Sequence, residues 1–150
     1  RPRSMKESIL ESRVAMAILW QGSLVGILVT FAFWYSYDAG KGAAGLMYAQ
    51  AVAFQVLVFD ELFRSFANRS KRRTLLELKP WTNLWLLIAV SASAALQLAV
   101  SFLPWTREIF KLPLLSAQDW GFIFVMALIP VTIIEIRKIA AQWLWGEIRQ

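Results

Sequence analysis

The stretch VAMAILWQGSLVGILVTFAFWYSY, residues Val14–Tyr37, contains no charged residue. A helix needs roughly 20 mostly apolar residues to cross a bilayer, so this stretch predicts a transmembrane helix. Leu84–Trp105 is also uncharged and predicts another, and two shorter apolar blocks, Ala43–Phe59 and Trp120–Ile134, run directly into charged residues. We therefore expect an all-α fold, a four-helix transmembrane bundle that forms a single membrane domain over residues 1–150. The expected spans are 14–37, 43–66, 83–105 and 118–138.

The overall composition agrees with a multi-pass integral membrane protein in contact with the lipid bilayer. Of the 150 residues, 58% are hydrophobic and only 17% are charged, which is more apolar than an ordinary soluble domain. The chain has no Cys and no His, so the soft ligands that copper or zinc transport needs are missing, and any bound ion would be hard and oxygen-ligated. The sequence also contains no phosphate-binding loop and no recognisable nucleophile–base pair. The chain alone therefore carries no catalytic motif and no cofactor site.

The net charge of +6 would suggest nucleic acid in a soluble protein, but the basic residues here gather between and after the expected spans. We interpret them as signals of membrane topology and expect no nucleic-acid partner. By the positive-inside bias, both termini and the central link are cytoplasmic. These basic residues are Arg1, Arg3, Lys6 and Arg13 before the first span, Arg69, Lys71, Arg72, Arg73 and Lys79 in the central link, and Arg137, Lys138 and Arg149 after the fourth span.

Two spans carry small or polar residues that favour contacts with other helices. In the first span, Gly22 and Gly26 form a G-x-x-x-G pair that would let another helix backbone approach closely. Such pairs also arise by chance, because Gly is common in membrane helices. In the third span, Gln97 needs a hydrogen-bonding partner inside the bundle.

The charges at the end of the second span, FQVLVFDELFRSF at residues 54–66, are the main candidates for function. At 1.5 Å per residue, Glu61 lies roughly 10 Å from the flank near Asn68, within the hydrocarbon. A lone carboxylate there is costly, so Glu61 should face the bundle interior with a partner or a metal ion. Asp60 and Arg64 have the spacing of an internal helix ion pair. Glu61 also reaches Arg64 at a spacing of three, and the cluster would then be an internal salt bridge without an ion.

The end of the fourth span contains a second group of charges. Arg137 and Lys138 can extend their charged ends to the membrane interface. Glu135 is expected to pair with them or with the basic central link. We interpret this group as structural.

Four segments resemble one known family. They are VLVFDELF at 56–63, NRSKRRTLL at 68–76, WTNLWLL at 81–87 and IIEIRK at 133–138. In their order and spacing they are similar to the C-terminal region of cation-transporting P-type ATPases, and most similar to calcium pumps of the sarcoplasmic reticulum and secretory-pathway type. The resemblance runs from about Arg1 to Lys138.

This resemblance implies a function and several partners. In that family the region supplies the last four of ten membrane helices, and a carboxylate on the eighth contributes to a calcium site. Aligned through the basic loop, that carboxylate falls on Glu61, and the Gly22 and Gly26 pair matches a glycine face that packs against the fifth helix. The implied function is the membrane domain of an ATP-driven cation pump, with Ca²⁺ as the transported cation. The implied partner is the remainder of the ATPase polypeptide, whose other domains would bind ATP and Mg²⁺.

Two features separate this chain from the family's calcium pumps. Arg64 stands where those pumps usually have an amide residue, which would favour fewer ions per cycle or another ion specificity. The phosphorylated aspartate and the nucleotide-binding domain have no counterpart here, and residue 1 is Arg rather than Met, so we expect a part of a longer polypeptide. The alternatives are an autonomous four-helix membrane scaffold and a small channel or exchanger, both with internally paired charges. An upstream D-K-T-G-T phosphorylation motif would favour the pump.

Overall fold

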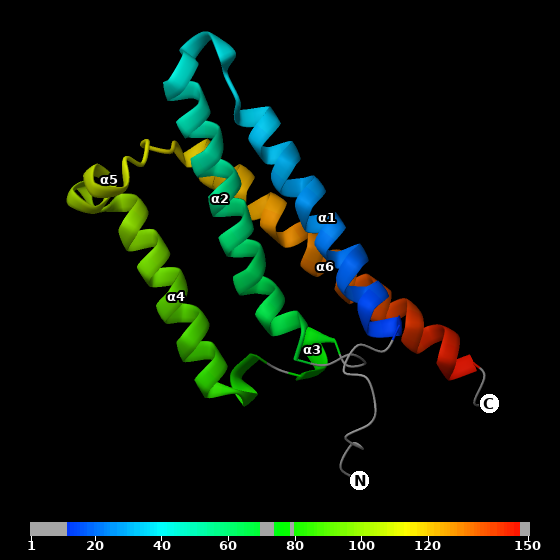
Figure 1. Ribbon diagram of the computed structural model, residues 1–150. Coiled ribbons are helices and arrows are strands. Elements are labelled where there is room, and N and C mark those ends of the chain that lie inside the picture. The colour runs from blue at the N-terminus through cyan, green and yellow to red at the C-terminus, as the bar shows by residue number, and fades with distance from the viewer. Residues whose placement is uncertain (1–11, 70–73, 79, 148–150) are drawn as a thin grey trace.

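The computed structural model describes residues 12–69, 74–78 and 80–147, and throughout these residues the regular structure is helical (Figure 1). The expected all-α class is confirmed. The elements in chain order are α1 (Ser12–Ser36), the 3-10 helix η1 (Ala39–Lys41), α2 (Gly42–Ala67), α3 (Leu75–Leu78), the 3-10 helix η2 (Pro80–Thr82), α4 (Leu84–Phe102), α5 (Pro104–Phe110) and α6 (Ala117–Glu147). The basic residues Arg1, Arg3, Lys6, Lys71, Arg72, Arg73, Lys79 and Arg149 lie outside the described residues.

Three of these helices are long and apolar enough to cross a membrane. The apolar segments are Ala15–Ser36, Ala39–Ala67 and Leu84–Phe102. The fourth expected span, 118–138, falls inside α6, which is not among these three helices. The fold is an all-α membrane bundle, and the number of spans and the side on which the termini lie stay predictions.

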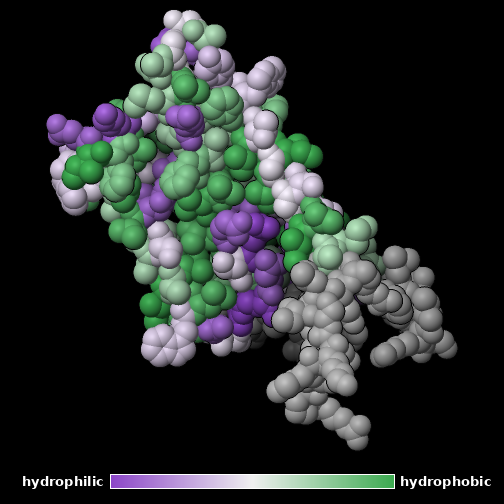
Figure 2. Space-filling view, viewed as in Figure 1, coloured by the Kyte–Doolittle hydropathy of each residue, from purple (hydrophilic) through white to green (hydrophobic). Residues whose placement is uncertain are grey.

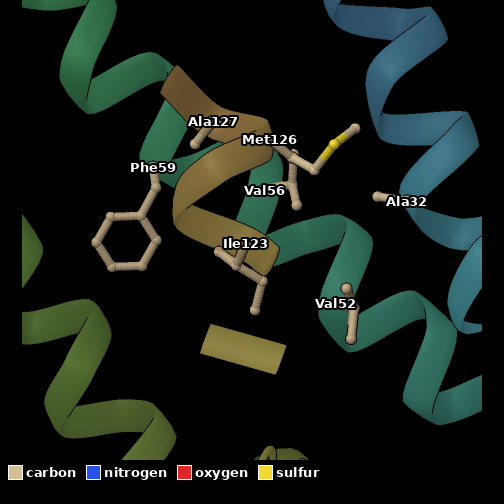
Figure 3. Packing of buried hydrophobic residues seen from close by; sticks show 7 residues of the cluster. All are labelled: Ala32, Val52, Val56, Phe59, Ile123, Met126 and Ala127. Carbon is tan, nitrogen blue, oxygen red and sulfur yellow. The ribbon is translucent and has the colours of Figure 1, made fainter. Parts of the chain in front are cut away.

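Helix α2 lies at the centre of the bundle. It packs along its length against α1 and α6, and more sparsely against α4, which stands apart in Figure 1. The shared core contains Ala32 from α1, Val52, Val56 and Phe59 from α2, and Ile123, Met126 and Ala127 from α6 (Figure 3). Other helices cover α2 on most sides. Neighbouring residues of α2 project in directions about 100° apart, so one can be buried while the next is exposed.

Much of the outer surface is hydrophobic, as a lipid-facing surface must be. Figure 2 shows one such face, on which hydrophilic residues gather in patches rather than spread evenly. Large apolar side chains are exposed on several helices, and Trp85 on α4 is 82% exposed. On a soluble protein, an exposed apolar surface of this extent marks a contact with a membrane or with another protein. In this chain the same surface fits contact with the lipid bilayer.

The turn between α1 and α2 is shaped by a carboxylate and by two glycines. The Asp38 side chain accepts a hydrogen bond from the Gly40 N–H at 3.0 Å and begins η1. Gly42 has a φ of 53°, a conformation that other residues seldom adopt. A Cβ at Gly45 would collide with the main-chain carbonyl oxygen of Asp38. The turn between α1 and α2 therefore depends on the absence of a side chain at Gly42 and at Gly45.

Proline decides where α4 ends. The expected third span continued to Trp105, but α4 stops at Phe102, and Leu103 is extended with φ −71° and ψ 129°. A residue before proline is driven out of the helical region by the ring of Pro104, which begins α5. Proline has no N–H for Val100 O, and the Thr106 hydroxyl donates to that carbonyl oxygen at 2.9 Å instead.

Candidate functional site

The two neighbouring acids of α2 point in different directions. Asp60 is buried, with 1% of its surface exposed, whereas the Glu61 side chain is 60% exposed. Successive residues of an α-helix are separated by about 100°, so one acid can face the core only if the other turns away from it. The expectation that Glu61 faces the interior of these helices is wrong, because the buried position on α2 belongs to Asp60.

Arg64 contacts both acids. Its Nε lies 2.9 Å from Asp60 Oδ2, and its Nη2 donates a hydrogen bond to Glu61 Oε1. The Asp60 contact is a charge pair without hydrogen-bond alignment, and among the described residues neither carboxylate oxygen of Asp60 has a hydrogen-bond partner. The structure thus brings together the three residues that the sequence singled out, with Arg64 between one buried and one exposed acid.

One stripe of α2 is left uncovered by the other described helices. Its exposed residues recur at helical spacing and are Gln50, Phe54, Leu57, Glu61 and Ser65. Three of them, Gln50, Glu61 and Ser65, have polar side chains within an apolar segment long enough to span a membrane, and the Ser65 hydroxyl donates to the Glu61 main-chain oxygen at 2.8 Å. Polar side chains at that depth normally face protein or a water-filled cavity rather than lipid. This uncovered stripe is therefore a surface suited to further protein.

The small residues of α1 are also uncovered. A Cβ built at Gly22 or at Gly26 would meet no atom within 4 Å, and both glycines are exposed. Close to them, the Thr30 hydroxyl donates to Gly26 O at 2.7 Å and so satisfies itself within α1. The described helices of this chain do not pack against the glycine pair.

A buried amide cluster joins α2 to α4. Gln55, 2% exposed, donates to Ser101 Oγ at 2.7 Å and accepts from Gln97 Nε2 at 3.0 Å. The expectation that Gln97 needs a partner inside the bundle is met by Gln55. Gln55 was not among the predicted contact residues, although an amide within an apolar span indicates a residue that needs a partner.

A second cluster fixes the end of α2 to α6. Lys138 is only 8% exposed, and its Nζ donates to Ala67 O at 2.5 Å and to Glu135 Oε1 at 2.7 Å. Glu135 Oε2 in turn accepts from the Leu75 N–H at 2.8 Å. Glu135 thus pairs with a neighbouring cation, as expected. The Lys138 ammonium is thus held at the end of α2, and its position relative to the membrane interface stays a prediction.

The opposite ends of the same two helices are also connected. The Tyr48 hydroxyl of α2 donates to the Asp119 carboxylate of α6. Ser116 N also donates to this carboxylate at 2.6 Å, while the Ser116 hydroxyl accepts from the Asp119 N–H at 3.2 Å, a reciprocal cap at the start of α6. Tyr48 and Asp119 were not predicted as partners from the sequence.

The described residues do not form a complete metal site by themselves. They contain no group of three or more Asp, Glu, His or Cys side chains placed to hold a metal ion. A calcium ion takes six to eight oxygen ligands. A single carboxylate such as Glu61 therefore does not make a calcium site by itself.

The chain matches the family described as "Cation transporting ATPase, C-terminus" over residues 1–140. The chain belongs to this family. It is the C-terminal membrane region of a cation-transporting P-type ATPase, and it is an integral, multi-pass membrane protein.

Several relatives of this ATPase region are named as calcium-transporting ATPases. The chain is 34% identical to calcium-transporting ATPase 1 of Lactococcus lactis subsp. lactis, covering 91% of this chain and 15% of that protein. It is 31% identical to the calcium-transporting ATPase of Bacillus subtilis, over 87% of this chain and 14% of that protein. It is 29% identical to calcium-transporting ATPase 1 of Bacillus cereus, over 93% of this chain and 17% of that protein. The ATPase region described here thus spans about a sixth of the length of these relatives.

Proposed function

We propose that this chain is the C-terminal membrane domain of an ATP-driven calcium pump, in which Glu61 contributes a carboxylate ligand to the transported Ca²⁺. The relatives named as calcium-transporting ATPases support the choice of cation. In this proposal, ATP and Mg²⁺ act through the other domains of the polypeptide, and the chain itself holds no cofactor.

The observation that carries the proposal is the position of Glu61 on the uncovered stripe of α2. Its side chain is exposed on this chain, although α2 is otherwise covered by α1, α6 and α4. A carboxylate at membrane depth normally faces protein or a water-filled cavity rather than lipid, and Arg64 covers only one of its oxygens. The preceding helices of the pump would cover the stripe and place Glu61 in the ion pathway.

A second role of the chain is to hold those preceding helices in place. The open Gly22 and Gly26 face on α1 supports this role, because a helix backbone can approach closely where no Cβ projects. In this proposal the partner is the remainder of the ATPase polypeptide, and lipid covers the apolar surfaces that remain.

The contact between Arg64 and Glu61 favours one alternative function. If Arg64 remains the only partner of Glu61, the cluster is an internal salt bridge and the chain acts as a membrane scaffold. The two functions differ in what happens to Glu61 when calcium is present.

The test is Glu61→Gln in the intact ATPase polypeptide. We expect the calcium concentration for half-maximal phosphorylation to rise about tenfold, since one ionic ligand is lost. Membrane insertion should not change, because glutamine keeps the size and the hydrogen-bonding ability of the side chain. An unchanged calcium dependence would contradict the ligand role and leave the scaffold.

A further inference from the structure

We infer that Asp60 is a positioning residue for Glu61: by keeping Arg64 in a buried contact, it allows Glu61 to leave the guanidinium and bind the transported cation. This inference rests on the proposed function. It assigns a role to the acid that does not touch the ion and explains why two adjacent acids share one arginine.

The two contacts of Arg64 lie in unequal surroundings. Asp60 is 1% exposed and the Arg64 side chain is 12% exposed, whereas the Glu61 side chain is 60% exposed. Breaking a buried ion pair leaves an uncompensated charge in a medium of low dielectric constant, which is strongly unfavourable. Separating the Glu61–Arg64 pair costs less when a cation takes the place of the guanidinium, because the uncovered side of Glu61 is open to that cation. Of the two acids, Glu61 is therefore the one that can leave Arg64.

The shape of arginine makes the shared arrangement possible. Arg64 uses Nε toward Asp60 and Nη2 toward Glu61, which are different donors on one planar group. Asp60 precedes Arg64 by four residues and Glu61 precedes it by three, and both spacings bring an acid and a cation together on a helix. A lysine ammonium would bind both acids through one nitrogen, whereas the planar guanidinium binds each acid through a different nitrogen.

The lack of other partners makes Asp60 dependent on Arg64. Within the described part of the chain, both carboxylate oxygens of Asp60 are buried without a hydrogen bond. Its contact with the guanidinium is therefore the interaction that compensates its charge. If Glu61 moves to the cation, Arg64 keeps Asp60 as a partner and stays in place. Without Asp60, Glu61 would be the only acid paired with Arg64 among the described residues and would be held by it.

The experiment uses the intact ATPase polypeptide and measures calcium activation of phosphorylation. Asp60→Asn removes the buried acid and keeps its shape. We expect the calcium concentration for half-maximal activation to rise about tenfold, since Arg64 then holds Glu61, while the maximal level of phosphorylation stays the same. The double variant Asp60→Asn with Arg64→Gln removes the cation as well and should return the half-maximal concentration to the wild-type value or below it.

The maximal level of phosphorylation separates positioning from a merely structural pair. If Asp60 and Arg64 only stabilise helix packing, Asp60→Asn should lower the maximal level, because a broken buried pair destabilises the protein, and should leave the half-maximal calcium concentration unchanged. That result overturns the inference. If Asp60→Asn fails to accumulate in the membrane, the half-maximal calcium concentration of the double variant tests the inference alone. The double variant buries no unpaired charge and should therefore still fold. A tenfold rise in that variant would then overturn the inference.

Two further variants complete the experiment. Asp38→Asn makes the same chemical change in an exposed ion pair with Lys41 and should leave the calcium dependence unchanged. Glu61→Gln distinguishes the two proposals. If it has no effect, the proposed function fails. If it weakens calcium activation while Asp60→Asn does not, only the positioning role of Asp60 fails.

Discussion

The Lys138 ammonium on α6 lies 2.5 Å from the main-chain carbonyl oxygen of Ala67 at the end of α2. The last carbonyls of a helix have no partner within the helix and carry its partial negative charge. A buried cation therefore satisfies the end of α2. Nearby, the Arg137 guanidinium lies 5.2 Å from the centre of the Trp20 ring on α1. These contacts place the start of α1, the end of α2 and the later part of α6 on the same side of the bundle.

Replacing Lys138 tests this capping role. We expect Lys138→Met to destabilise the protein by about 1–3 kcal/mol, because it leaves Ala67 O and Glu135 without their buried donor. The measurement is thermal unfolding of the purified protein in detergent. Lys41→Met is the matched control, since the Lys41 side chain is 71% exposed. Equal melting temperatures for the two variants would contradict the prediction.

The amide cluster between α2 and α4 predicts an energetic coupling. Gln55 and Gln97 share a hydrogen bond of 3.0 Å in a region where α4 has few other contacts with the bundle. We expect a double-mutant cycle of Gln55→Leu and Gln97→Leu to give a coupling of about 0.5–2 kcal/mol, the range found for hydrogen bonds between membrane helices. Strictly additive losses of stability would show that the two amides act independently.

The turn before α2 predicts that alanine substitutions at two glycines have very different effects on stability. Gly45→Ala should destabilise the protein by about 2 kcal/mol or more, because its Cβ would overlap the carbonyl oxygen of Asp38 and force the turn to move. Gly121→Ala on α6 is the matched control, since its Cβ would meet no atom within 4 Å, and alanine is the better helix former. The prediction fails if both variants have the same stability in detergent.

The glycine face of α1 predicts an effect that depends on the rest of the polypeptide. Gly26→Leu should not destabilise this chain alone, because a Cβ there meets no neighbour within 4 Å. In the intact ATPase we expect a clear loss of thermal stability, since a bulky side chain would separate two close-packed helices. The readouts are the melting temperatures of the chain and of the intact protein. Equal melting temperatures for the wild-type and variant intact proteins would show that no helix packs against Gly26.

Local spacing explains what was predictable at the candidate site. The apolar stretches indicated an all-α membrane fold because the length of a spanning helix is set by the bilayer itself. Asp60 and Arg64, four residues apart, adjoin on any α-helix, so their proximity needed no knowledge of the other helices. The motifs between residues 56 and 138 indicated the ATPase family, and the family match over residues 1–140 confirms it.

The direction of each side chain depended instead on elements far away in the chain. The presence of two acids and one arginine near the end of α2 follows from the sequence alone. The burial of Asp60 and the exposure of Glu61 depend on where α6 and α1 pack against α2. Likewise, Lys138 is buried because Ala67, distant in sequence, ends its helix beside it. Helix periodicity relates residues within a helix, whereas the side on which another helix packs is decided by the sum of the contacts across the bundle.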